Sequence, residues 1–140
     1  MAVKIARWIM LFCALSAIVA FISGFENVVI ASTNQKIVEL WRLLGFITFA
    51  GIFTLLAFKP TRYTGIWELV IFHKIAMAVS ALVLMKDNAE GAGFIGLIDG
   101  SLAILIIIAY FLSKGYASWG SSRKRRNGEK TQVENNQTFL

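Results

Sequence analysis

The chain contains four apolar runs, each about 18 or more residues long, which short polar stretches separate. A helix of that length crosses the roughly 30 Å hydrocarbon core of a bilayer. Hydrophobic residues make up 57% of the chain and charged residues 16%, whereas a soluble domain is about half apolar and a quarter charged. The sequence therefore predicts an all-α integral membrane protein, a four-transmembrane-helix bundle with spans at residues 5–23, 40–58, 66–85 and 94–112.

Polar and turn-forming residues mark the connections between the runs. In the first connection, residues 25–39, Ser32 and Gln35 have capping-box spacing, which predicts a helix start near Thr33. Pro60 lies in the second connection, where it interrupts no helix, and Thr64 is the predicted cap of the third helix. Four small residues of the second run are expected to allow close helix contact: Gly45, Ala50, Gly51 and Ala57.

The residues after the last run, 114–140, form a basic and polar tail, and we expect its last twenty or so residues to be disordered. A cluster of four cations follows the fourth run closely: Arg123, Lys124, Arg125 and Arg126. Basic residues beside a membrane gain about 1 kcal/mol each from anionic inner-leaflet lipid, which favours a lipid partner over nucleic acid. The alternative that the cluster only fixes orientation stays open.

The distribution of charge predicts the orientation of the chain. Lys4 and Arg7 precede the first run, and Lys59 and Arg62 lie in the second connection, whereas the third connection is slightly acidic. Under the positive-inside rule, both termini of a multi-pass protein of the cell membrane are then cytoplasmic. Three tryptophans at predicted helix ends agree with this arrangement, because the ring favours the membrane interface: Trp8, Trp41 and Trp67.

The first run could also be read as a cleavable signal peptide, since it has a basic start and an apolar centre. Residues 18–20, Ile-Val-Ala, make a poor cleavage site. Removal of the run would also leave an odd number of spans. We therefore expect a retained helix.

Five ionisable residues fall inside or at the ends of the runs, where an unpaired charge costs several kcal/mol. Glu68, His73 and Lys74 lie in the third run, Arg42 in the second and Asp99 in the fourth. At ~1.5 Å per residue, Arg42 and Asp99 lie at neighbouring depths, which predicts an ion pair between them. Lys74 lies about 10 Å from the level of Asp99, so it either lines the interior or extends toward the interface.

Helical spacing predicts which of these side chains face the interior. Asp99 shares one face of the fourth run with Gly96, Gly100 and Ala103, and a face of small residues packs against another helix. His73 shares a face with Ala76, Met77 and Ser80, so we expect it to point inward as well.

Glu68 is on a different face, in the first turn of the third helix, where the helix dipole favours an anion. Its expected partners are Lys59 or Arg62. For each of the five groups a structural role and a functional role both stay open, and His73 is the one that can titrate near neutral pH.

The chain has one cysteine, Cys13, and one histidine. A disulfide within the chain and a cysteine-based zinc site are therefore excluded, and no carboxylate stands at metal-ligand spacing beside His73. We expect Cys13 to be a small buried residue, and we expect neither a metal nor another cofactor.

The second run opens with Leu-Trp-Arg-Leu-Leu-Gly, residues 40–45, continues to Gly51 and leads into the turn that contains Pro60. This pattern resembles the DoxX-like small four-helix membrane proteins, over roughly residues 40–113. The resemblance implies a four-span bundle. Some members of that group are linked to quinone-dependent sulfur oxidation, but the resemblance carries over no catalytic residue.

Three functional hypotheses remain. The first is a non-enzymatic bundle that binds a lipid, a quinone-like molecule or a partner protein, because the sequence has no nucleophile–base or metal constellation. The second is a proton-linked transporter or channel component, because ionisable groups lie at membrane depth. The third is a membrane enzyme with His73 and either Asp99 or Glu68 as acid and base. A homodimer is compatible with each.

Overall fold

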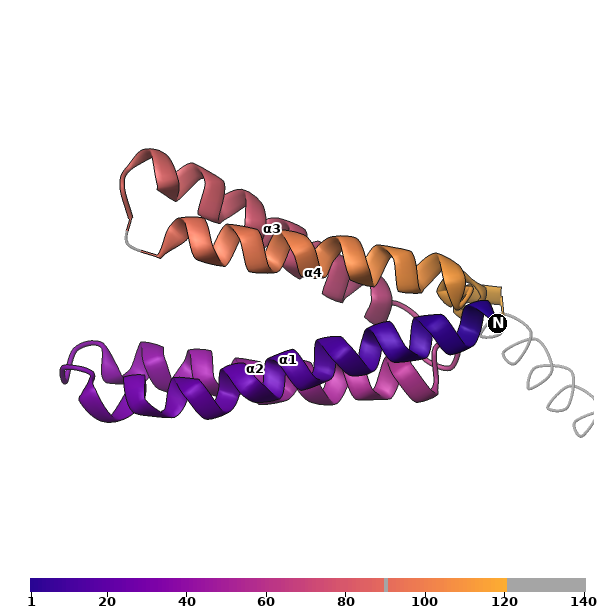
Figure 1. Ribbon diagram of the computed structural model, residues 1–140, viewed down its shortest axis with the longest axis horizontal. Helices are drawn as coiled ribbons and strands as arrows, with labels where there is room; N and C mark the ends of the chain where they lie inside the picture. The colour runs from indigo at the N-terminus through magenta and orange to yellow at the C-terminus, as the bar shows by residue number, and fades with distance from the viewer. Residues whose placement is uncertain (90, 121–140) are drawn as a thin grey trace, which may run out of the picture. The chain divides into compact units, whose positions relative to one another are not determined.

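The computed structural model describes residues 1–89 and 91–120. It contains four long helices, α1 (Ala2–Ile30), α2 (Lys36–Phe58), α3 (Ile66–Lys86) and α4 (Ala92–Leu112), and the short 3-10 helix η1 (Gly115–Ala117) (Figure 1). These described residues include no strand, so the predicted all-helical fold is confirmed. All four long helices have the length and hydropathy needed to cross a membrane.

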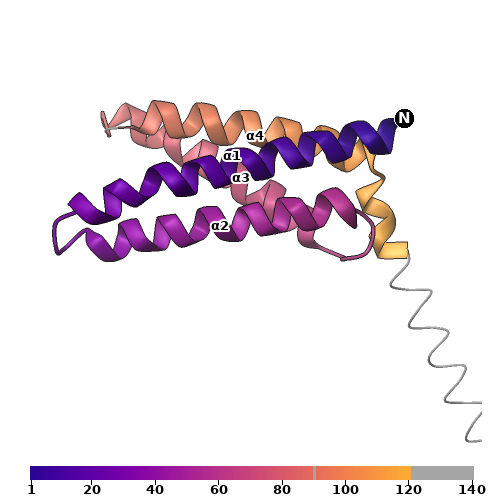
Figure 2. The ribbon, with the colours of Figure 1, turned by 60° about the horizontal axis from the view of Figure 1, so that its bottom comes forward.

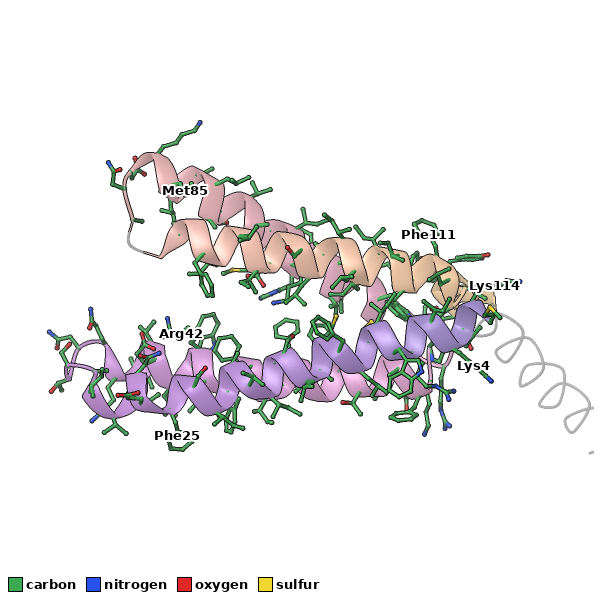
Figure 3. The ribbon with its side chains drawn as sticks, in the orientation of Figure 1. Lys4, Phe25, Arg42, Met85, Phe111 and Lys114 are labelled. Carbon is green, nitrogen blue, oxygen red and sulfur yellow. The ribbon has the colours of Figure 1, made fainter. Side chains whose placement is uncertain are left out.

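The helices form two units. The first is the antiparallel hairpin of α1 and α2, and the second, which begins at Lys59, holds α3, α4 and η1 (Figures 1 and 2). In the second unit, Met85 lies near the end of α3 and Lys114 just beyond the end of α4, at opposite ends of the hairpin (Figure 3). The start of α3 and the end of α4 therefore share one end of this hairpin.

In the first unit, α1 extends beyond its expected end. Residues 25–30, expected in the first connection, are helical, and the connection shortens to residues 31–35. No proline interrupts this segment, and Gly24 does not end the helix. Instead Gly24 is buried in it, where an added Cβ would lie 3.1 Å from Leu43 Cδ1 of α2. Ser32 Oγ donates a hydrogen bond to Gln35 Oε1 at 3.4 Å, and α2 begins at Lys36, three residues after the expected start near Thr33.

Small residues bring α1 and α2 together. Cys13 is fully buried, as predicted, and Ala50 and Ala57 are buried on α2. Gly45 and Gly51 do not contact α1 closely, because a Cβ added at either would meet no atom of the first unit within 4 Å. The buried side chains of this unit come from both helices: Ala6, Met10, Cys13, Ala14 and Ala17 of α1, and Leu43, Ala50, Phe53, Leu56 and Ala57 of α2.

In the second unit, the small-residue face of α4 packs as predicted. A Cβ added at Gly96 would lie 3.3 Å from the Ala81 Cβ, and one at Gly100 would lie 3.9 Å from the Ala78 Cβ. Asp99 and Ala103 on the same face are buried. The helix before it starts differently from the prediction, because the N-cap of α3 is Gly65, with φ +85°, and not Thr64. Glycine adopts this left-handed conformation without the steric cost that a side chain would add.

After α4 the chain reverses at Lys114, whose φ of +56° is left-handed, and enters η1. Ser113, Gly115 and Ser118 are buried in this segment. The predicted tail thus begins with residues that pack on the second unit. Its expected disorder and its cluster of Arg123, Lys124, Arg125 and Arg126 lie outside the described residues.

Candidate functional site

The strongest candidate site is an ion pair inside the α3–α4 hairpin. Lys74 Nζ lies 2.5 Å from Asp99 Oδ1, and the two side chains are only 10% and 12% exposed. A hydrogen bond between two ionised groups is roughly twice as strong as one between neutral groups. Because both side chains are largely buried, this ion pair is an important stabilising interaction for each charge.

The packing of α3 on α4 makes this pair possible. Gly100 lies opposite Ala78, so Asp99 is about one helical turn, ~6 Å, from the level of Lys74. The flexible four-carbon stem of lysine bridges that distance. The distance of about 10 Å expected from the sequence was too large, because it was counted from the ends of the runs and not from the contact between the helices.

Arg42, the predicted partner of Asp99, pairs instead with Glu39 one turn earlier on α2. The Arg42 side chain is 44% exposed, and an exposed ion pair of this kind contributes little to stability. The predicted Arg42–Asp99 pair is therefore corrected: the carboxylate that faces Arg42 is local, and the cation that faces Asp99 comes from α3.

His73 is exposed, whereas Lys74, the next residue, is buried. The buried face of α3 carries Trp67, Val70, Lys74 and Ala81, and not the face of His73, Ala76, Met77 and Ser80 that we expected. Successive residues differ by about 100° around a helix, so the buried face of α3 is rotated by about 100° from the expected face.

A second polar cluster surrounds Glu68 at the start of α3. Tyr110 Oη of α4 donates a hydrogen bond to Glu68 Oε1 at 2.9 Å, and Trp119 Nε1 donates to the same oxygen at 3.0 Å. The other carboxylate oxygen, Oε2, is buried and has no hydrogen-bond partner among the described residues. The expected partners Lys59 and Arg62 are therefore replaced by two aromatic donors.

Trp67 supports this cluster from inside the hairpin. Its ring is 1% exposed, and its Nε1 donates a hydrogen bond to the Pro60 carbonyl at 2.7 Å. The ring packs edge-on against Tyr110, and Gly115 lies so close that an added Cβ would be 2.8 Å from Trp67 Nε1. Trp67 thus lies at the helix end, as predicted, and its side chain is buried inside the hairpin.

The sequence offered little sign of these contacts. Tyr110 and Trp119 lie 42 and 51 residues from Glu68, and no local spacing links them.

Within residues 1–89 and 91–120, no three His, Cys, Asp or Glu side chains lie close enough together to hold a metal ion. The Lys74–Asp99 pair and the contacts of Glu68 can hold α3 against α4 and stabilise the charges between them.

We compared the chain with protein-family models, with curated proteins and with solved structures, and none of the three comparisons gave a match.

Proposed function

We propose that this is a non-enzymatic, multi-pass protein of the cell membrane whose helices bind a lipid, a quinone-like molecule or a partner protein within the bilayer. Both termini are cytoplasmic in this proposal, and the chain is a relative of the DoxX-like four-span group. The buried Lys74–Asp99 pair is the observation that supports it most strongly.

A catalytic acid or base needs a free position from which to exchange a proton with substrate. The Lys74 ammonium and the Asp99 carboxylate instead lie against each other with little exposure. Glu68 Oε1 likewise accepts hydrogen bonds from two protein donors. These contacts favour a structural role for the charged groups over a catalytic one.

The outer faces of the helices are the surfaces available for binding. Leu69 and Phe72 on α3 and Leu97 and Phe111 on α4 are more than three-fifths exposed. At most 28% of the apolar window of any long helix is buried within the chain. Such faces suit acyl chains or the helices of a membrane partner.

The test is native mass spectrometry of the full chain extracted gently from membranes, with chemical cross-linking in the same membranes. The proposal predicts a retained hydrophobic molecule or a cross-linked membrane protein at defined stoichiometry. Arg42→Gln is the control variant. It removes only the exposed Arg42–Glu39 pair, so it should retain the hydrophobic molecule or the membrane partner as the unchanged chain does. Reproducible turnover of an apolar substrate, lost in Asp99→Asn, would contradict the proposal.

One observation favours a proton-linked transporter as a second candidate, because Lys74 and Asp99 lie far from both ends of their helices. Lys74 is about 12 Å along α3 from Ile66. Ionisable residues at such depth often mark ion or proton pathways. Reconstituted vesicles would then show pH-driven flux that Asp99→Asn abolishes, and flux equal to that of empty vesicles would exclude this candidate.

A further inference from the structure

Two segments at one end of the second unit are joined into a single surface. Thr64 Oγ1 donates a hydrogen bond to the Ser118 carbonyl at 3.2 Å, and Trp67 Nε1 donates to the Pro60 carbonyl at 2.7 Å. Gly115 packs directly against the Trp67 ring. We call residues 59–65 and 113–120 together the interfacial cap.

The interfacial cap is positively charged. Lys59, Arg62 and Lys114 are all exposed, and the Arg62 guanidinium lies 5.8 Å from the centre of the Tyr63 ring. Glu68 is the nearby acid, but its Oε1 accepts hydrogen bonds from Tyr110 and Trp119, and its Oε2 is buried. The exposed cations therefore lack an exposed carboxylate to neutralise them within the described residues of the cap.

Two aromatic side chains of the cap are exposed beside these cations. Tyr116 is 49% exposed and Trp119 57% exposed. The hydrogen bond to Glu68 holds the Trp119 indole, so its orientation is fixed by the fold. Tyrosine and tryptophan at the ends of apolar helices sit at the headgroup level of a bilayer, where lipid phosphates also lie.

We propose that the interfacial cap binds the phosphate headgroup of an anionic phospholipid, with Lys59, Arg62 and Lys114 as its cations and Trp119 at the headgroup level. This inference rests on the proposed insertion of the helices in a membrane. The aromatic rings favour lipid over a soluble phosphate compound, because free phosphate offers them no apolar contact. The surface is made of other residues than the cluster at 123–126, and its three cations belong to described segments of the second unit.

The test compares two triple variants of the full chain, both with residues 123–126 changed to glutamine. The cap variant is Lys59→Gln/Arg62→Gln/Lys114→Gln. The control variant, Lys36→Gln/Arg42→Gln/Lys86→Gln, removes the same charge from exposed cations at the other ends of the two hairpins. Binding of phosphatidylglycerol and of phosphatidylcholine is measured for each in detergent by native mass spectrometry.

We expect the cap variant to bind phosphatidylglycerol about a hundredfold more weakly, since each cation near anionic lipid contributes about a fivefold effect. The control variant should change less than about threefold, and inorganic phosphate should not displace the lipid. Equal losses in the two variants, or no preference for phosphatidylglycerol in the parent protein, would overturn the inference.

Folding and insertion are measured separately. Circular dichroism and carbonate extraction report whether the cap variant is helical and embedded, and Lys59→Arg/Lys114→Arg should retain binding because it keeps the charges. A chain that is not embedded contradicts the proposed function. An embedded chain without a selective headgroup contradicts only the cap inference.

Discussion

The ion pair between Lys74 and Asp99 allows a quantitative prediction. We consider Lys74→Met, Asp99→Leu and the double variant, which replace the charges by apolar side chains. In the parent protein the two charges lie 2.5 Å apart with side-chain exposures of 10% and 12%. Each single variant therefore leaves one charge buried without its counterion.

Breaking a buried ion pair on one side costs about 3–5 kcal/mol, because the remaining charge is uncompensated. An uncompensated charge at the centre of a membrane helix costs at least ~2.5–3.5 kcal/mol on insertion scales. Replacing both partners by apolar residues is often neutral or stabilising. We expect each single variant to lose about 3 kcal/mol and the double variant to lose less than about 1 kcal/mol, which gives a coupling of about 5 kcal/mol.

The measurement is reversible unfolding of the purified chain in mixed micelles, followed by circular dichroism at a series of denaturing-detergent fractions. A double-mutant cycle separates the coupling of the pair from the effects of the single changes. Single variants that lose less than about 1 kcal/mol, with a coupling near zero, would show that the two charges are solvated and do not depend on each other.

Three further variants test other contacts in the same unfolding assay. Gly115→Ala should lower the free energy of unfolding by about 1–3 kcal/mol, because its Cβ would lie 2.6 Å from Tyr110 Cδ2. Its control, Gly120→Ala, should be nearly neutral, because the added Cβ would meet no described atom within 4 Å. Equal effects of the two changes would contradict the packing at Gly115. Gly96→Ala should destabilise α4 by about 1 kcal/mol relative to Gly45→Ala, because only Gly96 faces a neighbouring helix closely. Arg42→Gln should change stability by less than about 1 kcal/mol, since its ion pair is exposed; a larger loss would show that this pair is not solvated.

The helices themselves could be predicted because their apolar runs are long and are bounded by strong turn residues. The second span was expected to end at residue 58 and the fourth at residue 112, and α2 and α4 end at Phe58 and Leu112. The end of α1 could not be predicted in this way. Residues 25–30 were expected in the first connection, yet polar residues near the end of a long helix are compatible with its continuing, as it does to Ile30.

The faces of the helices were harder to predict, and the two helices of the second unit differ for a physical reason. On α4, small residues beside Asp99 marked the face that packs. On α3, apolar residues lie on every side, so hydrophobicity could not distinguish the face of His73 from that of Lys74. The partner of Asp99 also depends on the register between α3 and α4, which no local pattern contains.

The proposed four-span topology is tested most directly by a map of which connections are accessible from outside the cell. In a Cys13→Ala background, single cysteines replace Ala2, Ser32, Thr61 and Ala89, which are all exposed. A membrane-impermeant maleimide applied to intact cells should label the cysteines at positions 32 and 89, and should label those at positions 2 and 61 only after permeabilisation. Labelling of position 61 in intact cells, or equal labelling of all four before permeabilisation, would contradict a four-span protein with cytoplasmic termini.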